Sequence, residues 1–214
     1  MLPSKLLTLS TCLAPFLPDA WSYSWAEMSE AERLLPVEQL GLPSESLWRW
    51  VNEMTVGFDA GDVAWPHVIR SFDVASEIFL RLPIDREWRL LEIGLHVDDV
   101  DGFVRSERWA SPSPPGIVAS ILERQAIRTG GVALGFEVLG SEQGTPHSWL
   151  CNGLENDAAT SLGVRPNASG LLSTLDAARR ASRYFNDERL GEPVTWFPWL
   201  VVDLTSAVVT PERR

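Results

Sequence analysis

Hydrophobic and polar residues alternate along two stretches in the second half of the chain. In the runs LLEIGLHV (90–97) and VALGFEVL (132–139), larger apolar residues occupy almost every second position. Side chains of a strand point alternately to its two faces, so both runs predict strands with one apolar face. HSWLC (147–151) predicts a short third strand. WFPWLVVDLT (196–205) predicts a closing strand, in which Pro198 restricts the start to an edge or a bend.

The first part of the chain shows a helical spacing instead. In residues 1–83, the capping box SEAE (29–32) opens one helix, and the apolar residues between 47 and 54 recur three and four positions apart. Pro66 suits the first turn of a third helix, and Pro83 ends it. We therefore expect a helical N-terminal segment.

The order of the expected elements favours an α+β fold. Further helices follow the rigid loop SPSPPG (111–116) and cover about 171–186, between the strands. We expect a single domain over 1–214, with a helical part (1–83) packed on an α+β part (84–214). The sheet should be small and mostly antiparallel, with helices on one face, which would leave its other face for a partner.

The charge of the chain narrows the choice of partner. Acidic residues outnumber basic ones 29 to 18, and the formal net charge is −11. Phosphate binding needs a positive footprint, so nucleic acid and anionic membranes are excluded as main partners. A basic protein partner is compatible, because complementary charge raises the association rate. Solubility alone also accounts for the acidity.

Cysteine usage and hydropathy favour a cytoplasmic protein. Cys12 and Cys151 do not make a disulfide framework, which suits a reducing compartment. The apolar run in residues 1–20 is broken by Thr, Ser and Pro and lacks a clean cleavage site, so we do not expect export. No apolar run approaches the roughly 20 residues that a membrane-spanning helix needs.

One possible catalytic pair is His147 with Cys151. On a continuous strand these residues would share a face but lie about 13 Å apart, too far for proton transfer. The apolar surroundings of Cys151 are more typical of a small buried hydrophobic residue. A second possible set is Glu92, His96 and Glu137, which could share one face of the sheet as an acid–base group or as ordinary surface charges paired across strands.

Metal and cofactor sites are not expected. The three histidines and two cysteines show none of the close pairing of a zinc site. The run DDVDG (98–102) lacks the remaining ligands of a calcium loop and predicts an acidic turn instead. No glycine-rich phosphate loop follows a predicted strand.

Ten tryptophans are many for this length. Trp50 lies on the apolar side of its predicted helix, whereas Trp48 does not and is expected to be exposed; Trp109 lies in polar surroundings. Exposed tryptophans among acidic residues are typical of a surface that binds a basic protein. The alternative is that they pack the helical segment onto the sheet.

A family resemblance rests on the run GVALGFEVLG and on PHSWLCNGLENDAATSLGVRPNASGLL, followed by a helix and a Trp-rich closing strand. Over residues 88–204 this pattern resembles small acidic bacterial immunity proteins of contact-dependent and polymorphic toxin systems. The resemblance implies a single-domain cytoplasmic protein that neutralises a toxin by binding it, without a cofactor. The long, Trp-rich N-terminal segment departs from that pattern.

We therefore expect a non-enzymatic protein that binds a basic toxin domain. The alternatives are a small hydrolase that uses one of the two sets above, and a structural subunit or scaffold protein. The residues expected to contact the partner are Trp48, Asp98, Asp99, Asp101, Trp109, His147, Trp149 and Asn152.

Overall fold

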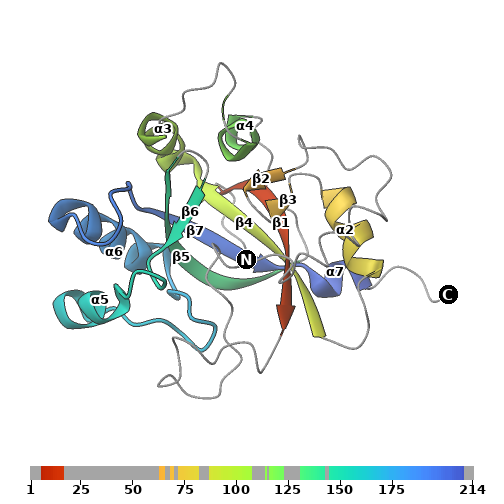
Figure 1. The fold of residues 1–214 in the computed structure, drawn as a ribbon. Helices are drawn as coiled ribbons and strands as arrows, with labels where there is room; N and C mark the ends of the chain where they lie inside the picture. The colour runs from red at the N-terminus through yellow and green to blue at the C-terminus, as the bar shows by residue number, and fades with distance from the viewer. Residues whose placement is uncertain are drawn as a thin grey trace.

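The computed structural model describes residues 6–16, 63–65, 68–69, 72–81, 87–107, 114, 116–122, 131–142 and 145–209. In this part of the chain, helices pack on a seven-stranded sheet whose paired strands are all antiparallel (Figure 1). The predicted α+β class with an antiparallel sheet is therefore confirmed.

The strands do not lie in the order in which they occur along the chain. Their order in the sheet is β2-β3-β1-β4-β7-β5-β6, so the last strand lies between β4 and β5. The strands are β1 (Leu6–Phe16), β2 (Val63–Trp65), β3 (Val68–Ile69), β4 (Glu87–His96), β5 (Val132–Glu142), β6 (Thr145–Ser148) and β7 (Phe197–Asp203).

Helices cover both faces of the sheet. They are α2 (Phe72–Arg81), α3 (Val97–Ser106), α4 (Gly116–Leu122), α5 (Glu155–Leu162), α6 (Leu175–Glu188) and α7 (Thr205–Val209). Apolar residues of α3 and α4 pack in one cluster with Ile93 and Val201 of the sheet, whereas those of α2, α5, α6 and α7 pack in another with Leu200 and Val202. We call these sides the α3 face and the α6 face. The prediction that helices lie on one face only is wrong, and no bare face of β4, β7 and β5 is left for a partner.

The central strands read as apolar runs because both of their faces are buried. Leu200 and Val202 of β7 point to the α6 face, and Trp199 and Val201 point to the α3 face, each 1% exposed or less. Pro198 is buried in this central strand rather than at an edge. It pairs with Val138 of β5 but lies beyond Trp199, the last β7 residue paired with β4, so its missing N–H interrupts no pairing with that strand.

The N-terminal segment differs from the prediction wherever it forms strands. Residues 6–16, 63–65 and 68–69 lie in β1, β2 and β3, although residues 1–83 were expected to be helical. Among the residues of this segment that the structure describes, 72–81 alone form a helix, as expected. The difference has a physical reason, since pairing with β4 and with each other satisfies the backbone groups of these strands. The expected helices between residues 29 and 54 lie outside the described residues.

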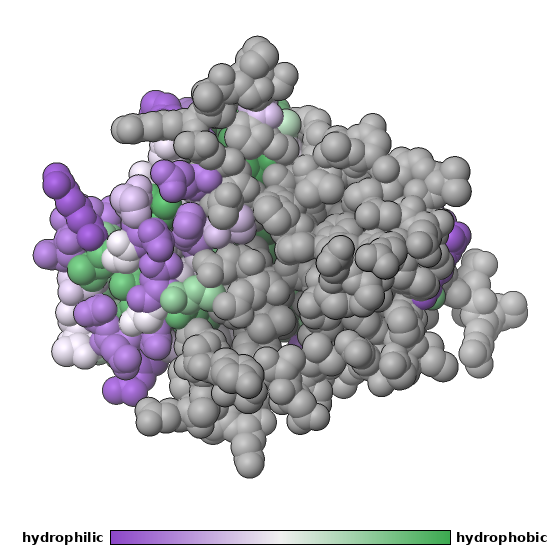
Figure 2. All heavy atoms as spheres, viewed as in Figure 1, coloured by the Kyte–Doolittle hydropathy of each residue, from purple (hydrophilic) through white to green (hydrophobic). Residues whose placement is uncertain are grey.

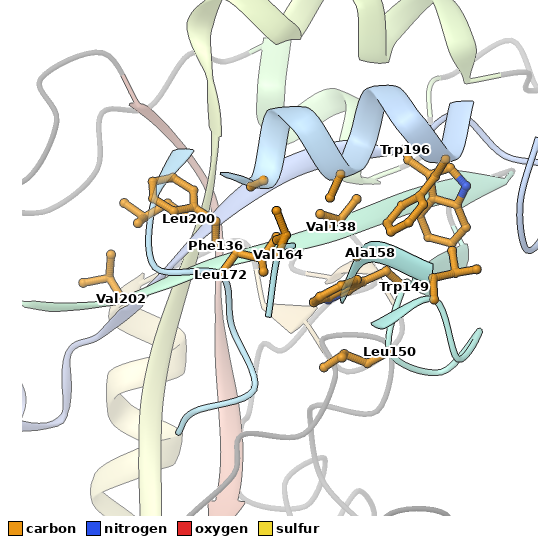
Figure 3. Packing of buried hydrophobic residues seen from close by; sticks show 14 of the residues in the cluster. Phe136, Val138, Trp149, Leu150, Ala158, Val164, Leu172, Trp196, Leu200 and Val202 are labelled. Atoms are coloured by element: carbon orange, nitrogen blue, oxygen red, sulfur yellow. The ribbon is translucent and has the colours of Figure 1, made fainter. Parts of the chain in front are cut away.

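The core on the α6 face is rich in aromatic residues. Phe185 of α6 lies 6.0 Å from Trp149 and 6.1 Å from Trp196, measured between ring centroids. Figure 3 shows Trp149 and Trp196 in one packed layer with Val138 and Ala158. This layer fixes the segment after β6 and the loop before β7 against α6.

Candidate partner-binding surface

The acidic run that begins at Asp98 is part of a helix. Strand β4 passes directly into α3 at His96, which has an extended backbone and serves as the N-cap, with Nδ1 accepting a hydrogen bond from the N–H of Asp98 at 3.2 Å. Asp98 and Asp99 lie in the first turn of α3, where negative charge interacts favourably with the helix dipole. The prediction of an acidic turn is therefore wrong, since these residues start a helix.

An arginine from α6 binds this first turn. The Nη2 atom of Arg179 lies 3.1 Å from Oδ2 of Asp99 and 3.7 Å from Oδ2 of Asp98. The same atom lies 3.0 Å from Nδ1 of His96. Four side chains from β4, α3 and α6 thus form one cluster, which we call the His96 cluster: His96, Asp98, Asp99 and Arg179.

The members of the His96 cluster differ in exposure. The Asp98 side chain is 64% exposed, whereas that of Asp99 is only 22% exposed. Asp99 therefore serves mainly to join α3 to α6, and Asp98 can still meet a partner. Asp101, one turn further along α3, is exposed as well.

The outward side of α3 forms a narrow surface that combines charge with one apolar side chain. Its exposed positions recur three and four residues apart, as expected for one side of a helix. Val97 is 39% exposed at the start of this row. We call this row the α3 stripe; it consists of Val97, Asp98, Asp101 and Arg105.

The segment around β6 contributes less to a surface than expected. Strand β6 ends at Ser148, and a turn follows it, so HSWLC does not form a continuous strand. His147 is half-buried in β6, opposite Gly140. Trp149 is 0% exposed in the core of the α6 face, so the prediction that its side chain contacts a partner is wrong.

Asn152 is committed to the fold through both ends of its side chain. Its Nδ2 donates to the carbonyl of Ser148 at 3.0 Å, and its Oδ1 accepts from the N–H of Glu192 at 3.1 Å. The side chain thus bridges the end of β6 and the loop before β7. Because both groups are used within the chain, Asn152 positions the backbone, and its predicted role as a contact residue is not supported by this geometry.

Ser148 of β6 and Glu137 of β5 form a buried polar pair. The Ser148 hydroxyl donates to Oε1 of Glu137 and accepts from the N–H of Leu150 at 3.2 Å. Glu137 is 1% exposed and Ser148 is 0% exposed. Without access to solvent or substrate this pair satisfies polar groups inside the fold.

The predicted acid–base set is split by the sheet. Glu92 pairs with Val202 of β7, which points to the α6 face, whereas Glu137 pairs with Trp199, which points to the α3 face. Paired residues share a face and neighbouring residues alternate, so Glu92 and Glu137 point to opposite faces. His96 is four residues from Glu92 and contacts α6, on the side away from Glu137. The prediction that these three residues share a face is therefore wrong.

The pairing of His147 with Cys151 stays a prediction. The distance expected for a continuous strand does not apply, because Cys151 lies in the turn after β6. The side chain of Cys151 is half-buried.

Trp48 and Trp109, the two tryptophans expected at the contact, lie outside the described residues. The residues that the structure does describe contain no group of three or more His, Cys, Asp or Glu side chains placed to hold a metal ion. No helix in the described ranges combines the length and hydrophobicity that a membrane crossing requires.

Sequence reasoning missed Arg179, the residue that ties the His96 cluster together. Its place in a basic segment (179–189) was a signal of an acidic neighbour, but many acidic residues were available. Only the fold brings α6 to the end of β4, across 80 residues of sequence from Asp99.

The chain matches no family model, no curated protein and no solved structure. A function for this chain is therefore inferred from its own residues.

Proposed function

We propose that this protein binds a basic partner protein and neutralises it, as an immunity protein neutralises its toxin. The proposal rests on the acidity of the exposed side chains. Within the described ranges, exposed acidic residues outnumber exposed arginines. The exposed acidic residues are Asp73, Glu77, Asp98, Asp101, Glu142, Asp157, Asp176, Asp187, Glu188 and Glu192, against Arg81, Arg105, Arg165, Arg180, Arg183 and Arg189.

These charges are unevenly distributed. Three of the six exposed arginines, Arg180, Arg183 and Arg189, belong to α6 or its C-cap, among acidic residues of the same helix. Asp176 pairs with Arg180 within α6, for example, at 3.7 Å. Figure 2 shows hydrophilic residues gathered over the α5 and α6 side of the molecule. This side is polar but balanced in charge, which suits contact with water.

The α3 stripe is better suited to a basic partner. Asp98 and Asp101 offer two exposed carboxylates, and Val97 beside them offers apolar area that a contact can bury. Arg179 is already bound to the buried side of the first turn, so Asp98 is held in place before a partner arrives. A held carboxylate loses less side-chain freedom on binding than a mobile one.

The first test is a pull-down with the full chain from its native cell, washed at low and at high salt. A basic partner that is retained at low salt and weakened at high salt supports the electrostatic contact. The partner is then expressed alone and together with this chain. Growth arrest by the partner alone, relieved by co-expression, is the expected result. A stable partner that is harmless alone would identify a structural subunit instead and overturn neutralisation.

The second test locates the contact. In Asp98→Asn/Asp101→Asn the two carboxylates of the α3 stripe are removed, and the rate of association with the identified partner should fall by roughly tenfold at low salt. The matched control, Asp157→Asn/Asp176→Asn, removes two exposed carboxylates from the first turns of α5 and α6. Equal losses in both variants would show that net charge alone drives binding and that the α3 stripe is not the contact.

A further inference from the structure

One nitrogen of His96 joins β4, α3 and α6. Its Nδ1 lies 3.2 Å from the backbone N of Asp98 and 3.0 Å from Nη2 of Arg179. A backbone N–H and a guanidinium are donors and offer no acceptor atom. Each can donate a hydrogen bond to Nδ1 only while this nitrogen keeps its lone pair, as in a neutral imidazole with its proton on Nε2.

The surroundings of His96 offer a second arrangement. Oδ2 of Asp98 lies 3.3 Å from Nδ1, close enough to accept a hydrogen bond from a protonated imidazole. The other charged groups at this junction are Asp99 of α3 and Arg179 of α6, which bind one another. From β1, the residue opposite His96 is Leu6, which brings no charge. The His96 side chain is 9% exposed, so the side chains of the cluster largely determine which arrangement is favoured.

We propose that His96 is a proton-operated switch that holds or releases the first turn of α3. Protonation of Nδ1 turns an acceptor into a donor, which breaks the capping bond to the N–H of Asp98. It also places an imidazolium beside the guanidinium of Arg179. The new N–H then binds the carboxylate of Asp98, while Asp99 retains Arg179.

The test spans about pH 5 to 8, because histidine is the side chain whose charge ordinarily changes in that range. The effect of the switch is local, since loss of the cap leaves the backbone N–H of Asp98 without its acceptor and lets the first turn of α3 fray. The segment that loosens is the start of α3, from Val97 to Val100. The proposal holds whether or not a partner protein binds this surface.

The test uses NMR on the full chain. Nitrogen-15 shifts of the His96 ring at about pH 7.5 should show the tautomer with its proton on Nε2. Amide-exchange protection factors of Asp98, Asp99 and Val100 should fall about tenfold between about pH 7.5 and about pH 5, the scale of a lost N-cap. Protection of the buried α6 residues Ala181 and Phe185 should change less, which separates local release from global unfolding.

His96→Asn is the decisive variant. The asparagine side-chain oxygen takes a place close to that of Nδ1, is a favoured helix cap and does not titrate. Protection of the first turn should then be the same at both pH values. His147→Asn is the matched control, because it removes a half-buried histidine outside the cluster and should keep the response of the unaltered chain.

Three results would overturn the switch: a proton on Nδ1 at neutral pH, protection of the first turn that is independent of pH in the unaltered chain, or the same fall in His96→Asn. If His96→Asn does not fold, Arg179→Met replaces it. That change removes the positive neighbour, so the fall in protection should begin at higher pH. An unchanged midpoint would contradict the proposed competition between proton and guanidinium.

Discussion

Replacement of Trp149 by alanine tests whether this residue supports the core or the surface. Its side chain is 0% exposed and packs at 6.0 Å from the Phe185 ring, in the layer that also holds Trp196 (Figure 3). A Trp→Ala change in such a site removes the buried ring and leaves a cavity, at a cost of about 3–5 kcal/mol in the free energy of unfolding. The free energy of unfolding of the whole domain is expected to be only about 5–15 kcal/mol, so the variant should be marginally stable.

Trp149→Phe should cost much less, for two reasons. The phenyl ring keeps most of the apolar contact with Phe185. In addition, the indole N–H is buried without an acceptor among the described residues, and an unsatisfied buried donor is unfavourable by roughly 1–3 kcal/mol. Phenylalanine removes that donor, so we expect a loss of less than about 2 kcal/mol.

Urea unfolding followed by far-UV circular dichroism measures both changes without relying on tryptophan fluorescence. With a slope of about 2 kcal/mol per M, a loss of about 4 kcal/mol lowers the midpoint by about 2 M. Val132→Ala is the control, because Val132 is 59% exposed and its truncation should change the stability by less than about 0.5 kcal/mol. A midpoint for Trp149→Ala equal to that of the control would refute the burial of Trp149 and restore it as a contact residue.

Three further changes test the backbone and its caps by the same unfolding assay. Gly135→Ala should lower the free energy of unfolding by about 2 kcal/mol or more, because φ is +145° and a Cβ would lie 2.8 Å from the carbonyl oxygen of Leu172. Gly163→Ala, with φ +65° and open space around its Cβ, should lower it by about 1 kcal/mol. Equal losses in the two variants would contradict the close approach at Gly135. Asn152→Ala should cost about 1–2 kcal/mol through its two lost hydrogen bonds, and a neutral result would return Asn152 to the surface. Thr174→Ala should cost about 1 kcal/mol by removing the N-cap of α6, whereas the exposed neighbour Ser173, changed to alanine, should have no measurable effect.

The strands in the second half of the chain could be predicted because their periodicity reflects burial directly. The alternation around Ile93 and the apolar run before Asp203 gave β4 and β7 within a few residues. What the pattern could not provide was their neighbours. A strand that is buried on both faces has the same sequence pattern wherever it lies in the sheet. The position of β7 between β4 and β5 is therefore known only from the strand pairing.

A single glycine shows how alternation can mislead. The pattern of β5 places Val132 and Phe136 on one face, but the strand has a bulge between Ala133 and Gly135. Val132 pairs with Asp203 and is exposed, while Phe136 pairs with Leu200 and is buried on the α6 face. An extra residue in one strand moves every later side chain to the other face. Gly135 has a positive φ at this bulge. The sequence alone does not distinguish Gly135 from an ordinary glycine in a strand.

For some of the expected contact residues exposure follows from local polarity, whereas for Trp149 burial depends on long-range packing. Asp98 and Asp101 are exposed, as a solvent-facing acidic run should be, and this much follows from local polarity. Trp149 was expected to contact a partner, yet its side chain is buried. Its burial depends on α5 and α6 folding back over β5, which is a long-range event that no local pattern records.

The His96 cluster follows from the point at which β4 ends. If β4 continued past His96, successive residues would alternate between the faces of the sheet, and the neighbours Asp98 and Asp99 could not both approach Arg179. Because α3 starts there, the chain turns, and its first two carboxylates meet the same guanidinium. The residue at that transition must be extended, must accept from the helix and must contact α6. A neutral imidazole can meet all three needs through the lone pair of Nδ1, which is why the proposed switch is placed at the junction of β4, α3 and α6.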